Sequence, residues 1–236
     1  MDINNYFNTP SGSFDGTLAG QMNLVMRRVY LKMTLGLIVT ALAAYLGANS
    51  MALLEFFAAH PMTMLLLFVA EIGLVIGITS GINKLSSPMA TALFYLFAVV
   101  NGVALFPIFL AYTSVSIYKT FFITAAVFGA MTVYGFFTTK DLSRWGQFLF
   151  MALLGLIIIS LVNIFLKSTT MEWLISFAGV FIFIGLTAWD TQRIKQMAML
   201  APVEAAGKIA TIGALNLYLD FINLFLYLLR FFGNRN

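Results

Sequence analysis

Long stretches without charge are the feature that most constrains how this chain can fold. Between Leu85 and Thr139, a run of 55 residues, the only charged side chain is Lys119. One membrane-crossing helix needs about 20 apolar residues, so this run is long enough for two crossings with a turn between them. Over all 236 residues, 61% are hydrophobic and 9% are charged, whereas a soluble domain carries about 25% charged residues. The sequence therefore predicts an all-α, polytopic membrane protein that is surrounded mainly by lipid.

The few charged and reactive residues exclude several classes of function. The 13 Lys and Arg and the 9 Asp and Glu give a net charge of +4, but the basic residues stand singly at the ends of apolar runs. That placement is typical of membrane topology and not of a phosphate-binding patch, so no nucleic-acid partner is expected. The chain has no cysteine and one histidine, His60, which excludes disulfides and thiolate metal sites. We expect no resident cofactor.

The apolar runs divide into seven predicted spanning helices. Pro61 suits the first turn of the second helix because it lacks an amide hydrogen, and the polar cluster at 112–116 predicts a turn inside the long uncharged run. Residues 1–26 are polar and are predicted to form a disordered cytosolic tail, followed by a single seven-helix domain at 27–236. The predicted helices are 27–48, 62–81, 88–111, 117–138, 148–166, 173–189 and 209–230.

The basic residues predict the orientation in the membrane, since cytoplasmic loops carry an excess of Lys and Arg. With a cytosolic N-terminus, nine basic residues fall inside and four outside. The four are Lys119, Lys167, Arg230 and Arg235, and the nine are Arg27, Arg28, Lys32, Lys84, Lys140, Arg144, Arg193, Lys195 and Lys208. This predicts a multi-pass protein of the inner (cell) membrane with a cytosolic N-terminus and an external C-terminus.

The carboxylate Asp220 lies in the middle of the predicted seventh helix. An aspartate there costs about 2.5–3.5 kcal/mol on insertion scales, so it needs a task or a partner. Helical spacing places it on one face with Gly213, Asn216, Asn223 and Tyr227. A polar stripe on an apolar helix must face protein or water, which predicts an inner helix. In the alternative interpretation, Asp220 only joins helices by hydrogen bonds.

A second carboxylate, Asp190, is predicted to end the sixth helix on the cytosolic side, where the seventh helix begins. Asp220 lies about 16 Å along the seventh helix, so the two carboxylates approach each other only if one helix is displaced along the other. Two close carboxylates in a low dielectric cannot both ionise freely and titrate as a unit. The pair is therefore a candidate proton-sensitive latch.

A third carboxylate, Glu71, lies on the predicted second helix beside the spacing Gly73-x-x-x-Gly77-x-x-x-Gly81. Such a glycine face is typical of close helix packing. Glu71 projects to the opposite side, about 200° from Gly73. Both sides of this helix are therefore predicted to meet something other than lipid.

The order of short motifs resembles the Bax inhibitor-1 family, in a bacterial member, from about residue 25 to the end. The motifs are Tyr112-Thr113, Phe121-Phe122, Thr124-Ala125-Ala126, Thr139-Lys140-Asp141-Leu142-Ser143, Trp189-Asp190-Thr191-Gln192 and Leu217-Tyr218-Leu219-Asp220. The resemblance implies six helices around a central seventh and a pH-sensitive calcium leak governed by two aspartates, which match Asp190 and Asp220. It also matches Glu71 to an acidic residue of the second helix.

The chain departs from some bacterial members of that family, which place an arginine near the cytosolic end of the second helix as a partner for the aspartates. Here that stretch is Ser80-Gly81-Ile82-Asn83-Lys84. Only Lys84 could act as the latch cation, and its ammonium cannot make the bidentate bond of an arginine.

Three functions remain open on the sequence. The first is a passive, proton-regulated pathway for Ca²⁺, which prefers 6–8 oxygen ligands; Glu71, Asn216 and Asn223 would line it, and Glu71 with Asp190 and Asp220 would form a weak calcium site. Its partners would be the lipid bilayer, Ca²⁺ and protons. The second is a regulatory membrane protein that docks on a membrane protease or stress machinery through residues 1–26.

The third is an intramembrane aspartyl protease, which also requires two aspartates on adjacent helices. In those proteases a Gly-x-Gly turn precedes the second aspartate, whereas here Leu217-Tyr218-Leu219 precedes Asp220. We therefore expect no enzyme activity.

Overall fold

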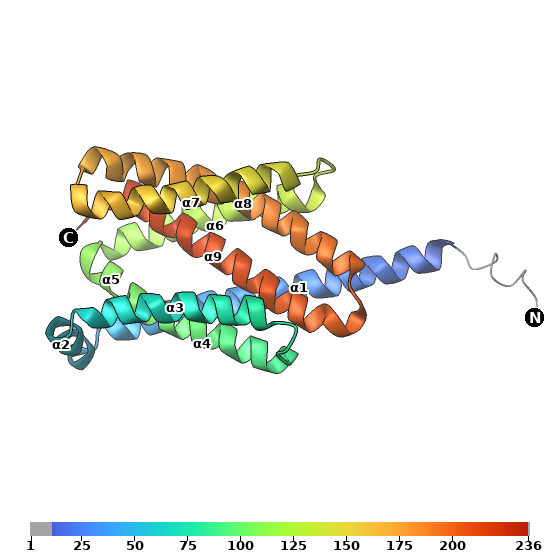
Figure 1. Cartoon of the computed structure of the whole chain (residues 1–236), viewed down its shortest axis with the longest axis horizontal. Coiled ribbons are helices and arrows are strands. Elements are labelled where there is room, and N and C mark those ends of the chain that lie inside the picture. Colours follow the sequence, from blue (N-terminus) through green and yellow to red (C-terminus); the bar gives the residue numbers. More distant parts are fainter. Residues whose placement is uncertain (1–10, 236) are drawn as a thin grey trace, which may run out of the picture.

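The fold is a bundle of long helices in the computed structural model, which describes residues 11–235, with side chains from Ala19 onward (Figure 1). The helices are α1 (Ser11–Ala48), α2 (Met51–Ala59), α3 (Met62–Gly81), α4 (Ser87–Leu105), α5 (Pro107–Ala111), α6 (Ser114–Phe137), α7 (Ser143–Leu166), α8 (Thr169–Leu200) and α9 (Ala206–Phe232), with a 3-10 turn at Val203–Ala205. Seven helical segments are long and apolar enough to cross a membrane, α4 and α5 together forming one of them. The prediction of an all-α protein with seven spanning segments is confirmed.

Helix boundaries follow local sequence signals at most positions. The side chains of Ser86, Thr113 and Ser168 accept backbone N–H groups at the starts of α4, α6 and α8, as expected of N-cap residues. Pro107 interrupts the predicted helix 88–111 and separates α4 from α5. The reason is that proline lacks the N–H that would continue the hydrogen-bond ladder.

The N-terminal boundary differs from the sequence-based expectation. Helix α1 begins at Ser11, inside the segment 1–26 that is predicted to be a disordered tail, and Val25 and Met26 are buried in the core. These apolar side chains pack against the bundle, and the helix is continuous from there into the membrane span. Residues 1–10 lie outside the described part of the chain.

Helix α8 also differs, because it continues to Leu200 and does not end near Trp189. Its polar residues find protein partners. Gln192 bonds to the backbone of Leu142 at 2.9 Å and of Lys140 at 2.8 Å, and Lys195 Nζ donates to the Phe136 carbonyl at 2.7 Å. Because these bonds go to α6 and the α6–α7 turn, polar side chains here do not mark a helix end.

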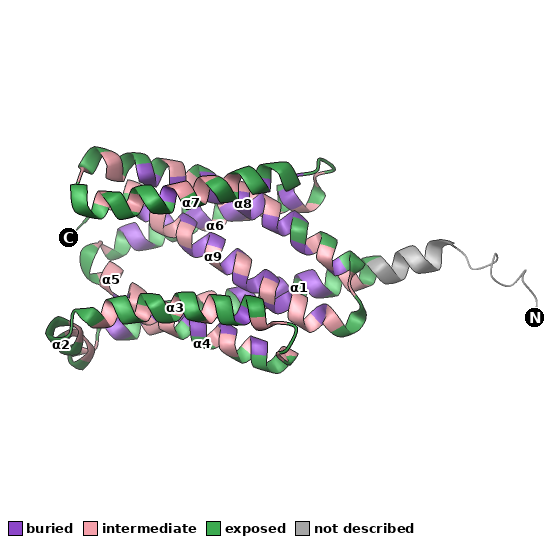
Figure 2. Cartoon of the chain, in the orientation of Figure 1, coloured by how far each residue is buried: buried purple, intermediate pink, exposed green. Residues whose placement is uncertain are grey.

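Helix α9 runs through the middle of the bundle (Figure 1), packed against α1, α4, α6 and α8, while α3 packs on α4 and α7 packs on α8. Buried residues follow α9 and α8, and the outer helices α3 and α7 are mostly exposed (Figure 2). Since apolar exposed residues suit a lipid environment, the outer helices form the lipid-facing surface. The predicted central seventh helix is confirmed.

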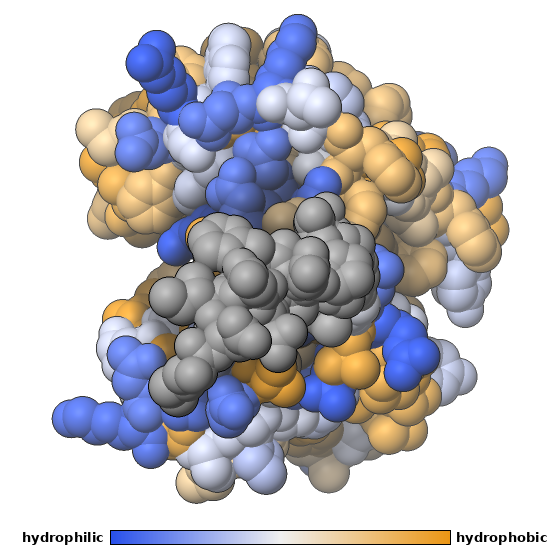
Figure 3. Space-filling model, turned by 90° about the vertical axis from the view of Figure 1, so that its right-hand side faces the viewer, coloured by the Kyte–Doolittle hydropathy of each residue, from blue (hydrophilic) through white to orange (hydrophobic). Residues whose placement is uncertain are grey.

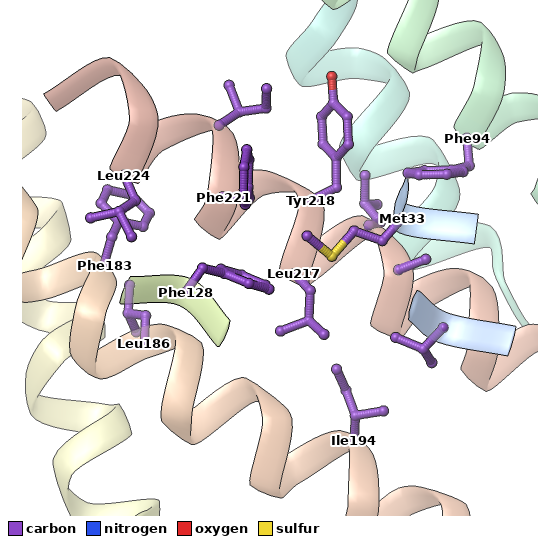
Figure 4. Packing of buried hydrophobic residues seen from close by; sticks show 14 of the residues in the cluster. Met33, Phe94, Phe128, Phe183, Leu186, Ile194, Leu217, Tyr218, Phe221 and Leu224 are labelled. Atoms are coloured by element: carbon purple, nitrogen blue, oxygen red, sulfur yellow. The ribbon is translucent and has the colours of Figure 1, made fainter. Parts of the chain in front are cut away.

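The core around α9 is built from aromatic and aliphatic side chains (Figure 4). The ring of Tyr218 packs edge-on against Phe94 and Phe97, with ring centroids 5.8 and 5.6 Å apart. Phe128 of α6 packs in the same way on Phe221, at 5.4 Å. These edge-to-face contacts hold α4 and α6 on different sides of the central helix.

Glycines allow close approach at only some helix contacts. A methyl group on Gly102 would lie 2.6 Å from the Thr40 carbonyl oxygen, so α1 and α4 approach closely there. By contrast, a methyl on Gly73 or Gly77 would meet no atom within 4 Å. The predicted packing face of α3 is therefore wrong, because these glycines face away from the bundle.

Candidate functional site

Asp190 and Asp220 lie together on the two neighbouring helices α8 and α9, which run antiparallel. Asp190 is about 15 Å before the end of α8 and Asp220 about 21 Å after the start of α9, at 1.5 Å per residue, so both lie at similar depth. Their carboxyl groups interact directly with each other, and the two residues are 8% and 4% exposed. The expected pair is present, but Asp190 lies inside its helix and does not end it, which corrects that prediction.

The contact between the two carboxyl groups has a chemical requirement. An ionised carboxylate only accepts hydrogen bonds, so two of them can bond to each other only through a proton carried by one. Asp190 Oδ1 and Asp220 Oδ2 are buried and have no hydrogen-bond partner among the described residues. A proton shared between the two carboxyl groups would give them a hydrogen bond, whereas its loss would leave two buried charges side by side.

A cavity of about 510 Å³ opens beside this pair, between α7, α8 and α9. One water occupies about 30 Å³ in the liquid, so the cavity can hold several. Its polar wall comes from α9, where Asn216 and Asn223 lie one turn before and one turn after Asp220. The lining residues are Phe150, Leu153, Ile157, Phe183, Leu186, Trp189, Asp190, Arg193, Asn216, Leu219, Asp220, Asn223 and Tyr227.

The cation beside the aspartates is Arg193, which sequence reasoning counted only as a topology signal. It lies one turn after Asp190 on α8, lines the same cavity, and its charge acts on Asp190. Its guanidinium lies 5.3 Å from the ring centroid of Trp189, a cation–π contact that holds it at the cavity wall. Arg193 lies at the cavity because α8 continues beyond Asp190.

Lys84, the predicted latch cation, does not reach this site. It is exposed in the turn between α3 and α4, where its backbone N–H bonds to the Gly81 carbonyl at 2.9 Å. That turn belongs to the α3–α4 side of the bundle, while the aspartates face α7. The assignment of Lys84 is therefore corrected in favour of Arg193.

Glu71 belongs to a separate polar site on the other side of α9. Asn101 donates to Glu71 Oε1 at 2.9 Å, and Tyr218 donates to Asn101 Oδ1 at 2.8 Å. The Tyr218 hydroxyl also bonds to Thr40 at 2.5 Å. No three His, Cys, Asp or Glu side chains gather to hold a metal ion anywhere in the described chain. The predicted calcium site combining Glu71 with Asp190 and Asp220 is thus wrong.

Lys32 forms a third polar site that the sequence analysis did not single out. Its ammonium donates to Thr91 Oγ1 and Thr211 Oγ1, each at 2.7 Å, and approaches the Gly207 carbonyl oxygen at 3.5 Å. It therefore joins the middle of α1 to the beginnings of α4 and α9. The available signal was a lysine directly before the uncharged run 33–54, but the sequence does not show which residues that lysine binds.

The chain is similar in sequence to known membrane proteins. A family model described as "Inhibitor of apoptosis-promoting Bax1" matches residues 22–236. The chain is 46% identical over 213 residues to "Inner membrane protein YbhL" of Escherichia coli (strain K12), covering 89% of this chain and 91% of that protein. It is 44% identical over 215 residues to an uncharacterized protein of Borreliella burgdorferi, covering 90% and 93%. The chain therefore belongs to the Bax inhibitor-1 family of multi-pass membrane proteins.

Proposed function

We propose that this protein is a passive cation pathway, for Ca²⁺ above all, whose flux is regulated by a proton shared between Asp190 and Asp220. The observation that carries the proposal is the buried contact between these two carboxyl groups at the wall of the 510 Å³ cavity. The cavity offers carboxylate and amide oxygens, the ligand type that Ca²⁺ prefers. Few such oxygens are present, so binding would be weak, which suits passage through the membrane.

The proton changes the balance of charge at the contact between α8 and α9. With the proton present, the two carboxyl groups carry one negative charge and hold the helices together by a hydrogen bond. Without it, two buried negative charges repel each other, and a cation entering the cavity would replace the proton. Arg193 is the one further charged residue among those that line this cavity, so it is the counter-charge in both states.

The other sides of α9 are less suited to cations. On the side of α1 and α4, the Lys32 ammonium bonds to Thr91 and Thr211. The described hydrogen-bond partners of this ammonium are hydroxyl and carbonyl oxygens, so its charge is not offset by a carboxylate among them, whereas Arg193 shares its cavity with two aspartates. This contrast favours the cavity between α7, α8 and α9 as the pathway.

We also propose that the protein lies in the inner membrane with a cytosolic N-terminus and an external C-terminus. The relative from Escherichia coli is named an inner membrane protein. The end of the bundle where α3–α4, α6–α7 and α8–α9 turn has a hydrophilic surface, with hydrophobic sides (Figure 3). Lys84, Lys140 and Lys208 lie at that end, which supports its cytosolic position.

The geometry does not favour an intramembrane protease. A protease must present an extended peptide to both aspartates, but α8 and α9 are continuous helices through Asp190 and Asp220. The described residues also carry no specific feature that favours docking on a protease or stress machinery. We therefore propose a non-enzymatic role.

The test is reconstitution of the purified protein into liposomes that contain a calcium dye, over a pH series. The proposal expects calcium entry above that of empty liposomes and a change of entry rate with pH. The Asp190→Asn, Asp220→Asn double variant is compared in the same assay. Calcium entry no faster than in empty liposomes at every pH would contradict the proposal and favour a regulatory role.

A further inference from the structure

Tyr227 lies at the end of the aspartate cavity that is nearer the C-terminus. It follows Asp220 by about 10 Å along α9 and belongs to the cavity lining. Its ring packs against α8, where it stacks on Phe183 with ring centroids 5.9 Å apart and an interplanar angle of 26°. The ring also covers Gly179, since a methyl group there would lie 2.7 Å from three of its carbon atoms. Glycine is therefore required for the ring to lie this close to α8.

A second cavity, of about 200 Å³, lies beyond this ring toward the C-terminal end of α9. On α8 its lining ends at Ser176, while the lining of the aspartate cavity begins at Phe183. On α9 the aspartate cavity ends at Tyr227 and the second cavity begins at Arg230. The second cavity is lined by Thr169, Glu172, Trp173, Ser176, Arg230, Phe231 and Arg235. The contact between Tyr227 and Gly179 thus lies between the two cavities along α8 and α9.

Arg230 supports the ring from the side of the second cavity. Its guanidinium lies 5.7 Å from the centroid of Tyr227, within the range of a cation–π contact. This places a positive charge next to the ring, facing away from the aspartates. A cation that approaches from that end therefore meets a charge and then an aromatic ring.

We propose that Tyr227 is the residue that closes the aspartate cavity at its C-terminal end, and that movement of its ring away from Gly179 joins the two cavities. The ring is only half-buried, so its displacement does not require the core to unfold. The proposal rests on the proposed cation flux for its purpose, but the closure itself concerns access to the cavity and can be measured without any flux.

Single-cysteine labelling tests the closure directly, because the natural chain contains no cysteine. Asn223→Cys places a thiol in the aspartate cavity, one turn before Tyr227. Thr170→Cys places a reference thiol on an exposed position at the start of α8, at the C-terminal end of the bundle. A membrane-impermeant cationic thiol reagent is added to intact cells and to inverted vesicles. The preparation that labels Thr170→Cys is the one that reports on this end.

In that preparation, Asn223→Cys should react slowly when Tyr227 is present and at least ten times faster with Tyr227→Ala. Tyr227→Phe keeps the ring and should remain slow. Gly179→Ala pushes the ring aside without removing it and should also react faster. Its matched control is Gly155→Ala on α7, where a methyl group meets no atom within 4 Å and labelling should stay slow. The proposal would be overturned if Asn223→Cys reacted at the same rate with the natural Tyr227 and with Tyr227→Ala. This holds provided that Thr170→Cys labels normally in both backgrounds.

Calcium entry into liposomes then separates this inference from the proposed function. If both hold, Tyr227→Ala raises calcium entry together with labelling. If labelling rises while no variant conducts calcium, the closure by Tyr227 stands and the proposed calcium flux fails. If the wild-type protein conducts calcium and Tyr227→Ala changes neither reading, the closure fails and the proposed function stands.

Discussion

Tyr218 and Asp220 project from opposite sides of α9, about 200° apart around the helix. The Tyr218 hydroxyl bonds to Asn101 of α4 and to Thr40 of α1, whereas Asp220 contacts Asp190 of α8. These two polar sites of the central helix therefore share no side chain. Because sites without shared partners respond independently, mutations should separate proton regulation from packing.

Replacement of either aspartate should remove most of the pH dependence of calcium entry. Asp190→Asn and Asp220→Asn keep the size and hydrogen-bonding capacity of the side chain but cannot share a proton. The double variant should add little to either single variant, since members of one unit are not additive. The measurement is the rate of calcium entry into liposomes between about pH 5 and pH 8.

Asp141→Asn is the matched control for that experiment. Asp141 is exposed in the turn before α7 and accepts the Ser143 N–H at 2.9 Å. Hydrogen bonds from the side chain and backbone of Ser143 lower the pKa of Asp141. It stays ionised throughout the tested range, so its removal should leave the pH profile unchanged. A wild-type profile in both single aspartate variants would refute proton sharing.

Disruption of the Tyr218 site should affect stability and not proton regulation. Tyr218→Phe removes the hydrogen bonds to Asn101 and Thr40, and leaves their oxygens without that partner. Hydrogen bonds between membrane helices contribute about 0.6 to 1.7 kcal/mol each, so we expect a loss of about 1–2 kcal/mol in unfolding free energy. Tyr118→Phe, at an exposed position on α6, is the control and should change little. Unfolding in detergent, followed by circular dichroism, measures both.

Glu71→Gln should leave calcium entry and its pH profile close to those of the wild type. The glutamine oxygen can still accept the bond from Asn101 that Glu71 accepts at 2.9 Å, and Glu71 does not line the aspartate cavity. The sequence alone places Glu71 in the ion pathway, and from that assignment a reduced flux would be expected. A reduction of several-fold in well-folded protein would restore that assignment.

Two glycines of α6 should respond oppositely to alanine. A methyl group on Gly135 would collide with the Ala188 carbonyl oxygen of α8, whereas one on Gly129 meets nothing within 4 Å. Gly135→Ala should thus cost about 1–3 kcal/mol, as overpacking does. Gly129→Ala should be neutral or stabilising by up to about 1 kcal/mol, because alanine favours a helix. Thermal unfolding of the two variants side by side decides whether α6 and α8 are in direct backbone contact.

Reporter fusions test the orientation of the chain. The C-terminal residues are held at one end of the bundle, where Asn234 N–H donates to Ser116 Oγ at 2.9 Å and Arg235 pairs with Glu172 at 3.1 Å. A reporter that is active only outside the cytosol should work after Arg235, and one inserted at Lys140 should be active only in the cytosol. Activity of a cytosol-only reporter at the C-terminus would reverse the orientation.

The number of crossings and the inner helix could be predicted from the sequence alone, for a physical reason. Lipid offers no hydrogen bonds, so each crossing must be a long uncharged helix, and such runs are visible without any structure. The polar face of the seventh helix is likewise periodic, with Asn216, Asp220 and Asn223 spaced as helix neighbours. That periodicity was enough to indicate that α9 lies inside the bundle.

Only the tertiary structure decided which polar residues meet. Gln192 and Lys195 suggest the water-exposed end of a helix, yet α6 and its following turn supply their partners. Helix α8 therefore continues and carries Arg193 to the aspartate cavity. In the same way, Asn101 and Tyr218 take Glu71 into a separate site. Helical periodicity shows which side chains share a face of one helix. It does not show which neighbouring helix that face contacts, because packing among several helices makes that choice.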